Sequence, residues 1–431
     1  NLLEKNLNKI NFKNLSYLIK NNKIILTFVA LFVIFISYLL LPTFYKQSDI
    51  SKVFNIGLQK KLDLNFKFSK KIKYNLFPRP HFITTDIIIN DNQTEIAKIK
   101  KLKIYVSLDN LFSFKNIQIK NLIIENANFN INKKNYNFFL NLLNNNFKDG
   151  NLIIKKRNVF FRNLEDEVLF INKILKMKYF YEPKELKNIF YLDNEIFNTP
   201  FSIKTFFKED KSKIFSEINI DLFKLKIKNE LNLDKGIKVG KSEFNINKIK
   251  RFADYQIEKN YFNFQISDKV DQPNIRYDGK FNFKPFYATL EGDVAEINLS
   301  YLFGTNAIIS QLLKTEMFNN KNIDFKLNIN ADSVYDNSNF RNINLRSKIQ
   351  DGLIDTDKTR FDWRDFATFE LLESLIFVRD GELVFNKGIS EGRWSKEWWG
   401  RLSNKTSQLF FCDSIFGISN ASIFPINMFG V

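Results

Sequence analysis

Hydrophobic residues follow two different periods along the chain. Residues 24–41 form an uncharged apolar run, and Pro42 follows it directly. A helix of this length spans about 27 Å, close to the ~30 Å hydrocarbon core of a bilayer. The run is longer than the apolar region of a signal peptide and lacks the small residues of a cleavage site. We therefore expect a retained transmembrane anchor at 24–41.

A short amphipathic helix is predicted just after the anchor. Ile50, Val53, Phe54 and Leu58 recur at helical spacing, and Asp49 or Ser48 is a suitable N-cap. The apolar stripe has two possible uses. It packs against the first strands of the following domain, which we favour, or it lies on the bilayer surface.

From residue 62 the hydrophobic period changes to two, which is typical of half-buried strands. Leu102, Ile104, Val106 and Leu108 alternate with polar residues, and the alternation resumes after residue 200. Further segments of this kind contain these pairs: Ile117 and Ile119, Phe281 and Phe283, Leu327 and Ile329, Leu383 and Phe385.

Three stretches interrupt the alternation and have helical spacing, at 136–143, 168–181 and 299–317. Many strands, few helices and no βαβ rhythm predict a mainly β protein, built as one long antiparallel sheet or as a string of sandwiches. A closed sandwich buries the apolar side of each strand against a second sheet. An open, curled sheet instead leaves a continuous apolar groove, and a monomer rarely exposes so much apolar surface unless something binds there.

The composition argues against nucleic-acid binding, although the net charge is +18. The basic residues are spread along the whole chain and do not gather on one element. An AT-rich coding bias would produce such an abundance of Asn, Lys, Ile and Phe without selection for charge. Weak attraction to anionic lipid headgroups is the expected consequence of this charge.

Catalytic chemistry has few candidates in this sequence. The single cysteine, Cys412, excludes an intramolecular disulfide, and the single histidine, His81, lies in a stiff proline-flanked segment. No pair of carboxylates stands out, and glycine is too scarce for a glycine-rich phosphate loop. We expect no enzyme activity, no cofactor and no metal site.

The chain divides into five segments. A basic tail (1–23), with the anchor at 24–41, precedes a β region at 46–140 that begins with the amphipathic helix. An extended β-rich region follows at 141–390. The final segment, 391–431, contains three of the four tryptophans, and is either an aromatic membrane-contact element or the altered end of a truncated or frame-shifted gene. The basic tail favours a cytoplasmic N-terminus with the rest of the chain in the periplasm.

The ordered segments of residues 1–140 resemble the AsmA family of inner-membrane-anchored periplasmic proteins. The resemblance rests on the basic tail, the anchor, the helix at 50–61, and the following segments: Leu64-Asn65-Phe66-Lys67-Phe68, Phe77-Pro78-Arg79-Pro80-His81-Phe82, residues 96–108, Leu111-Phe112, Ile117-Gln118-Ile119 and Leu122-Ile123-Ile124. Residues 200–390 share the β-rich style of the family without a diagnostic motif.

The resemblance implies a long, curled, groove-like β-sheet lined by apolar side chains, which takes part in phospholipid transport between the inner and outer membranes and in outer-membrane integrity. The expected partners are the acyl chains of membrane lipids. The residues expected to line the groove are Ile104, Val106, Ile117, Ile119, Phe281, Phe283, Leu327 and Ile329. The alternative is a scaffold for outer-membrane protein assembly, with a closed sandwich core, a protein partner and no lipid. An outer-membrane β-barrel also shows alternation, but the anchor argues against it.

Overall fold

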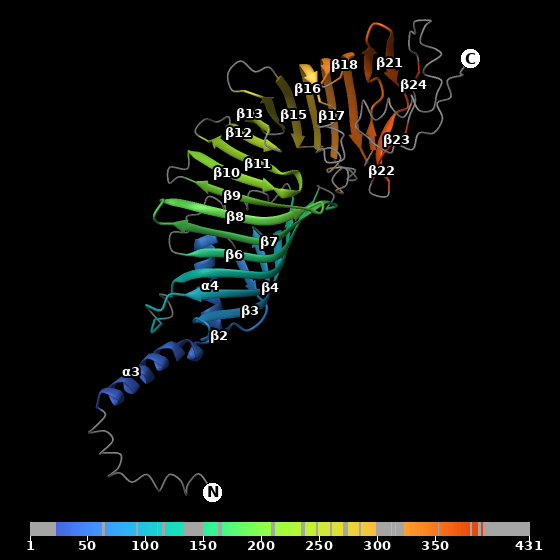
Figure 1. Ribbon diagram of the computed structural model, residues 1–431. Helices are drawn as coiled ribbons and strands as arrows, with labels where there is room; N and C mark the ends of the chain where they lie inside the picture. Colours follow the sequence, from blue (N-terminus) through green and yellow to red (C-terminus); the bar gives the residue numbers. More distant parts are fainter. Residues whose placement is uncertain are drawn as a thin grey trace. The chain divides into compact units, whose positions relative to one another are not determined.

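The protein is mainly β, with a single sheet of 24 strands that is not closed and two α-helices near the N-terminus among the described residues (Figure 1). The computed structural model describes residues 23–390 apart from these positions: 63–64, 92–93, 110, 114–116, 133–149, 163–165, 208–211, 234–237, 247–248, 259–260, 270–274, 284–285, 299–311, 313–314, 316–322, 336, 352, 380–381 and 387–388. The expected helix 136–143, nearly all of the expected helix 299–317, and the tail 391–431 with Cys412 therefore lie outside the described residues.

The chain forms two compact units. The N-terminal unit consists mainly of residues up to Asn128 and the C-terminal unit mainly of residues from Ile154 onward. The first contains these elements: α3 (Lys23–Leu40), the 3₁₀ turn η1 (Leu41–Phe44), α4 (Gln47–Leu62), β1 (Asn65–Phe68), β2 (Lys73–Asn75), β3 (His81–Asp91) and β4 (Thr94–Val106). Strands β5 (Ile119–Ile131) and β6 (Asn151–Arg162) contribute residues to both units.

The C-terminal unit continues with eighteen strands and a second 3₁₀ turn. The elements in order are β7 (Val168–Glu182), β8 (Lys187–Ile196), β9 (Thr199–Phe207), β10 (Lys213–Ile220), η3 (Asp221–Phe223), β11 (Leu225–Asn232), β12 (Lys238–Ile246), β13 (Ile249–Ile257), β14 (Tyr261–Ser267), β15 (Ile275–Phe283), β16 (Phe286–Ile297), β17 (Ile323–Val334), β18 (Asn337–Gln350), β19 (Leu353–Asp355), β20 (Arg360–Trp363), β21 (Ala367–Leu371), β22 (Leu375–Arg379), β23 (Glu382–Asn386) and β24 (Ile389–Ser390).

The apolar run at 24–41 forms helix α3, as predicted. The helix and η1 together give a candidate span from Lys23 to Phe44 with a mean hydropathy of 2.9. Within it, the Thr27 hydroxyl donates to the Lys23 carbonyl oxygen at 2.9 Å, so this polar side chain is satisfied inside its own helix. Pro42 lies in η1, where its missing N–H ends the α-helical pattern.

Helix α4 packs on the sheet of the N-terminal unit, which confirms the favoured use of its apolar stripe. Ile50, Phe54 and Leu58 are buried, and the Phe54 ring meets the Phe82 ring of β3 edge-on at 4.9 Å. Gly57 allows the closest approach, because a Cβ there would lie 3.0 Å from Ile119 Cδ1. The apolar side of this part of the sheet is therefore covered by a helix.

The prediction of a helix at 168–181 is wrong, because these residues form most of strand β7. The register of β7 against β8 shifts between Ile174 and Lys176, so Leu175 is an extra residue in the strand. A bulge of this kind breaks the period of two. It places Ile171, Ile174 and Leu175 at spacings of three and four, which resemble a helical stripe.

Each strand from β7 to β16 pairs antiparallel with the next, as expected. The pairing of β16 with β17 is parallel, which corrects the expectation of a purely antiparallel sheet. Parallel neighbours need a crossover, and the long connection from residue 298 to 322 provides the chain length for one. The predicted helix 299–317 falls in this connection.

The end of the C-terminal unit has a closed hydrophobic core. Apolar residues of β16–β18 and of β19–β22 form one buried cluster, in which Leu327, Ile329 and Phe361 are each at most 3% exposed. The Phe361 ring lies 5.3 Å from the Phe369 ring and 5.8 Å from the Phe340 ring. Here the later strands cover the apolar side of the earlier ones.

Candidate functional site

Strands β9–β15 place most of their apolar side chains on one face and most of their charged side chains on the other. Directly opposite residues in a ladder share a face, so the registers define both faces. We call the apolar face the surface formed by these residues: Phe201, Ile203, Thr205, Ile214, Ser216, Ile218, Ile220, Leu225, Ile227, Asn229, Leu231, Gly240, Ser242, Phe244, Ile246, Ile249, Arg251, Ala253, Tyr255, Ile257, Phe262, Phe264, Ile266, Ile275, Tyr277, Gly279 and Phe281. The alternate residues form the polar face.

The apolar face is covered far less than the cores at the two ends of the chain. Of the apolar side chains described between Thr199 and Phe283, only Phe223 and Ala253 are buried. Ile203, Ile227 and Phe244 are half-buried, although each lies in the middle of its strand. In this region the apolar face therefore keeps contact with solvent.

Three aromatic rings lie flat on this face because each is opposite a glycine. A Cβ on Gly240 would come within 2.1 Å of Tyr255 Cζ, and a Cβ on Gly279 within 2.1 Å of Phe264 Cζ. Tyr277 covers Gly292 in the same way, at 2.4 Å from Cδ1. Each pair is directly opposite in its ladder. Glycine gives the ring room to lie on the backbone of the next strand.

Tyr255 and Phe264 are themselves opposite each other on β13 and β14. The Tyr255 ring lies toward β12 and the Phe264 ring toward β15, so the two rings turn away from each other. The result is a low aromatic floor along one registered row of the apolar face.

A second registered row carries small polar groups. Thr205, Ser216, Asn229 and Ser242 are successive neighbours on β9–β12. The Thr205 and Ser216 hydroxyls lie 3.1 Å apart, and Ser242 donates to Asn229 Oδ1 at 2.7 Å. Tyr255 reaches the same oxygen with its hydroxyl at 2.7 Å. These groups satisfy one another, so the row adds little polarity to the apolar face.

Two charged residues lie on the apolar face of β9–β15, Lys238 and Arg251. Lys238 is at the exposed start of β12, whereas Arg251 lies within the face. It lies opposite Phe244. In the described part of the chain its guanidinium donates one hydrogen bond, from Nη1 to the Lys250 carbonyl oxygen at 2.9 Å, and pairs with no carboxylate. Burial raises the pKa of the Tyr277 phenol, and the nearby charge of Arg251 lowers it in part.

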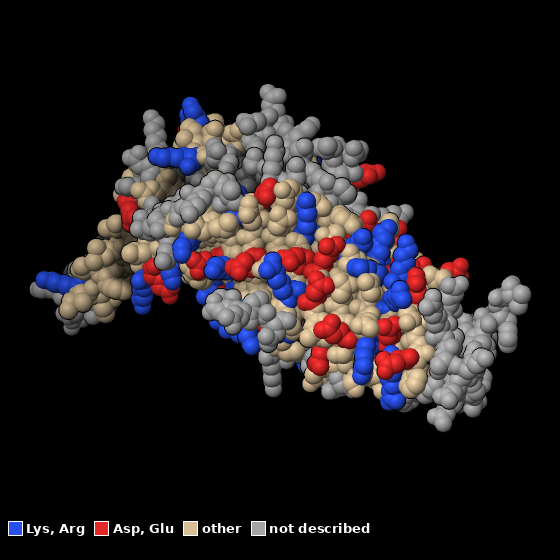
Figure 2. Space-filling model, turned by 90° about the horizontal axis from the view of Figure 1, so that it is seen from above, with Lys and Arg blue, Asp and Glu red and all other residues tan. Residues whose placement is uncertain are grey.

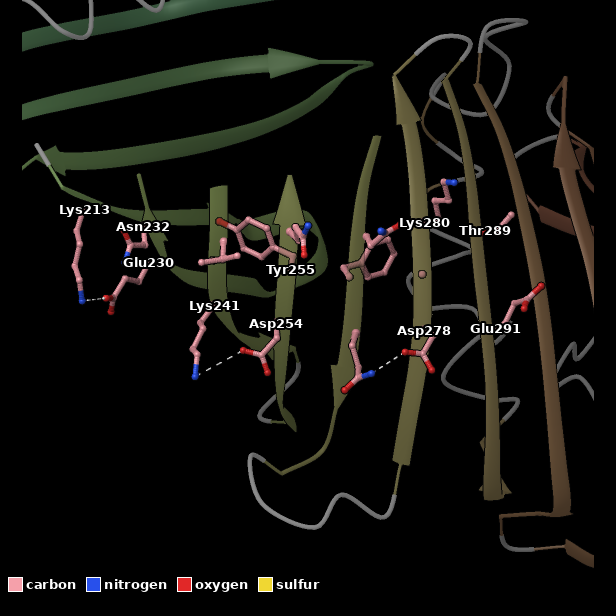
Figure 3. Close-up of a pocket in the computed structure, with 17 residues that line it drawn as sticks. Lys213, Glu230, Asn232, Lys241, Asp254, Tyr255, Asp278, Lys280, Thr289 and Glu291 are labelled. Atoms are coloured by element: carbon pink, nitrogen blue, oxygen red, sulfur yellow. Dashed lines mark hydrogen bonds and ion pairs between the residues drawn. The ribbon is translucent and has the colours of Figure 1, made fainter. Parts of the chain in front are cut away.

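The polar face carries a shallow concavity of about 960 Å³ (Figure 3). Its charged groups are largely paired across strands: Lys213 Nζ lies 2.6 Å from Glu230 Oε1, and Lys241 Nζ lies 3.9 Å from Asp254 Oδ1. Gln265 Nε2 donates to Asp278 Oδ1 at 2.7 Å. Exposed pairs of this kind contribute little free energy.

Figure 2 shows Lys and Arg interleaved with Asp and Glu on one face of the molecule, without a large area of one sign. This distribution suits a hydrated surface better than a surface for a polyanion.

Most of the residues predicted to line a groove lie in the closed cores. Ile104, Val106 and Ile119 are buried in the sheet of the N-terminal unit, and Leu327 and Ile329 are buried in the C-terminal cluster. Ile117 is half-buried just before β5.

Of these predicted residues, Phe281 lies on the apolar face, opposite Phe262 at a ring distance of 5.4 Å. Phe283 ends β15 and is paired with Phe286. The central strands β9–β14 were predicted as strands, but their apolar residues were not singled out, because alternation alone does not distinguish a covered face from an open one.

The described residues contain no cluster of His, Cys, Asp and Glu that could hold a metal ion. His81 is buried, stacks on the Tyr105 ring at 4.9 Å, and has its Nδ1 2.6 Å from the Arg79 carbonyl oxygen. Its contacts are those of a structural residue. Neither a known family model nor a curated protein matches this chain. The resemblance to the AsmA family thus rests on the sequence segments described above.

Proposed function

We propose that this protein is a non-enzymatic, membrane-anchored protein that binds lipid acyl chains on the apolar face of β9–β15. The observation that supports this most directly is that the apolar side chains of this face are only partly buried. The same kind of face is covered by α4 in the N-terminal unit and by β19–β22 at the end of the C-terminal unit. Among the described residues, the apolar sides of the strands at these two places are thus covered, whereas the apolar face of β9–β15 stays accessible.

An acyl chain is the ligand that fits such a surface. Each CH₂ group removed from water contributes about 0.8 kcal/mol, and the low aromatic floor of Tyr255 and Phe264 gives a long chain a smooth path across strands. The headgroup can remain hydrated at the edge of the sheet. No covalent step and no cofactor are required.

The proposed biological role is phospholipid transport between the inner and outer membranes, with an effect on outer-membrane integrity. Helix α3 would anchor the chain in the inner membrane, with both β units in the periplasm. The support for this role is the candidate span combined with an accessible apolar face, together with the sequence resemblance to the AsmA family.

Site-specific photocrosslinking tests the proposal. A photoreactive amino acid at Ile227 on the apolar face should give lipid adducts in the full-length protein in cell membranes, detected by mass spectrometry. The matched control is Lys228, the next residue on β11, which points to the opposite face and is exposed. Equal lipid labelling at the two positions, or none at Ile227 and Phe244, would rule out lipid binding on this face.

A scaffold for outer-membrane protein assembly is the second candidate. The closed core of β16–β22 favours it, because a folded end with a covered apolar face suits a docking module. This function predicts protein adducts and no lipid adducts from the same crosslinker at Ile227.

A further inference from the structure

The end of helix α3 is fastened to the sheet of the N-terminal unit by three tyrosines. The Tyr38 hydroxyl donates to the Leu108 carbonyl oxygen at 2.5 Å and accepts from the Leu111 N–H at 3.1 Å. Tyr74, on β2, donates to the carbonyl oxygen of Leu39 at 2.7 Å. The hydroxyl of Tyr45 donates to the Leu111 carbonyl oxygen.

These contacts come from separate segments, namely the turn after β4 and strand β2. Hydrogen bonds from both segments converge on the last turn of α3 and on the residues just after it. The N-terminal unit therefore meets the candidate span through a defined interface, and its position relative to the membrane is tied to the helix.

Three phenylalanines in the segments that form this interface are highly exposed. Phe44, Phe77 and Phe112 are 83%, 81% and 78% exposed. The next most exposed large apolar side chain outside α3, in the described part of the chain, is Leu186 at 57%. The three residues are thus set apart from the rest of the protein surface.

Each phenylalanine is linked to a residue that holds the helix end. The Phe112 ring contacts the Tyr38 ring at a centroid distance of 4.8 Å. Phe44 directly precedes Tyr45, and Phe77 follows strand β2, which carries Tyr74. Three segments that are separate in sequence therefore carry one exposed phenylalanine each next to a residue that contacts the end of α3.

We infer that Phe44, Phe77 and Phe112 form a membrane-contact platform that rests in the interface of the bilayer crossed by α3. Exposure of three aromatic rings to water is energetically unfavourable, whereas aromatic side chains are stable at the membrane–water interface. Lys46, Lys73 and Arg79 are exposed in the same segments. Their charges complement anionic headgroups.

The platform has a consequence for the orientation of the protein. A helix alone leaves an attached domain free to tilt, but three side chains around the helix end add contacts in the plane of the bilayer. The N-terminal unit is then held against the membrane surface by both the span and the platform. This inference requires α3 to be in a bilayer and does not depend on lipid binding by β9–β15.

Fluorescence quenching by lipids tests the platform. In the full-length protein carrying Cys412→Ser, single cysteines replace Phe44, Phe77 or Phe112 and receive an environment-sensitive fluorophore. The protein is reconstituted into vesicles of phosphatidylethanolamine and phosphatidylglycerol that contain lipids brominated near the headgroup end of the acyl chain. We expect strong quenching at all three positions and weaker quenching at Leu186→Cys, an exposed position that takes no part in the contacts at the end of α3.

A fluorophore at Phe28→Cys, inside α3, distinguishes failure of the platform from failure of the membrane anchor. Quenching at Phe28 without quenching at the three platform positions, combined with their quenching by aqueous iodide, would overturn the platform while leaving the anchor intact. Absence of quenching at Phe28 would overturn the anchor itself. Fluorophores at the three positions that neither quencher reaches would indicate a protein partner and would likewise overturn the platform.

Discussion

The Tyr255 ring lies on Gly240, the residue directly opposite it on the neighbouring strand. Phe264 and Tyr277 make the same arrangement with Gly279 and Gly292. The chain has only 14 glycines among 431 residues, and three of them, on β12, β15 and β16, serve this purpose. Glycine is otherwise unfavourable within strands, so its use here points to a requirement for flat rings on the apolar face.

The substitution Gly279→Ala should destabilise the protein through the Phe264 ring. A Cβ at this position would collide with the ring, which would have to rise from the sheet or shift sideways, at a cost of about 1–3 kcal/mol. Urea unfolding of the full-length protein in detergent measures the change in the free energy of unfolding. If the raised ring also obstructs the apolar face, lipid crosslinking at Ile227 falls in the same variant.

The double variant Gly279→Ala with Phe264→Ala is the control for this prediction. Removing the ring removes the collision, so the two substitutions should be less destabilising together than the sum of their separate effects. Strict additivity would show that the ring does not depend on the glycine.

The substitution Arg251→Gln should change the selectivity of lipid binding more than its strength. A guanidinium on an apolar face can pair with the phosphate or carboxylate of a bound amphiphile, and such a charge-assisted bond is typically stronger than a neutral one. Crosslinking at Ile227 should favour phosphatidic acid over diacylglycerol with the same acyl chains by about tenfold in the wild-type protein. The preference should be lost in Arg251→Gln and largely kept in Arg251→Lys.

Equal labelling by phosphatidic acid and diacylglycerol in the wild-type protein would contradict the role of Arg251 and leave acyl-chain binding intact. An arm with oleate distinguishes a carboxylate from a phosphate headgroup.

Replacing a phenylalanine by alanine should lower the free energy of unfolding more in the closed core than on the apolar face. Phe361 is 3% exposed and contacts the rings of Phe340 and Phe369, so Phe361→Ala should lower the free energy of unfolding by about 3–5 kcal/mol. Phe244 is half-buried, and Phe244→Ala should cost less than about 2 kcal/mol. Similar losses in urea unfolding would mean that the apolar face is covered in solution.

Tyr74, which contacts the end of α3, should make the N-terminal unit sensitive to alkaline pH. Burial, with a smaller effect of Tyr45, raises the pKa of Tyr74 from 10.0 to about 12. The unfolded chain therefore loses this proton at a lower pH than the folded protein, and the stabilisation is complete below pH 10.0 and lost as the pH rises toward 12. Tyr74→Phe should flatten the decline in stability over this range, measured by urea unfolding at a series of pH values.

The strands that the sequence predicted best are those with an unbroken alternation. Ile227 and Lys228 point to opposite faces of β11 simply because successive side chains alternate in a strand. The prediction failed at 168–181, where the extra residue Leu175 in β7 mimics a helical stripe. A bulge is decided by pairing with the neighbouring strand, which a local pattern does not contain.

The candidate site was only partly predictable for a related reason. Ile104 and Ile227 have the same alternating pattern, yet Ile104 is buried and Ile227 is half-buried. The difference lies in what covers each face, and the covering elements come from distant parts of the chain. Arg251 and Gly240 gave no signal in the sequence, because their significance depends on Phe244 and Tyr255 across the ladder.

By itself the sequence determined that the chain has one long apolar helix near its start and many strands with one apolar and one polar face. Both follow from local periodicity, since a helix and a strand repeat at fixed spacings. Only the tertiary structure decided which apolar faces are closed. Helix α4 and strands β19–β22 each cover one region, and the apolar face of β9–β15 is left half-exposed because these covering elements pack elsewhere.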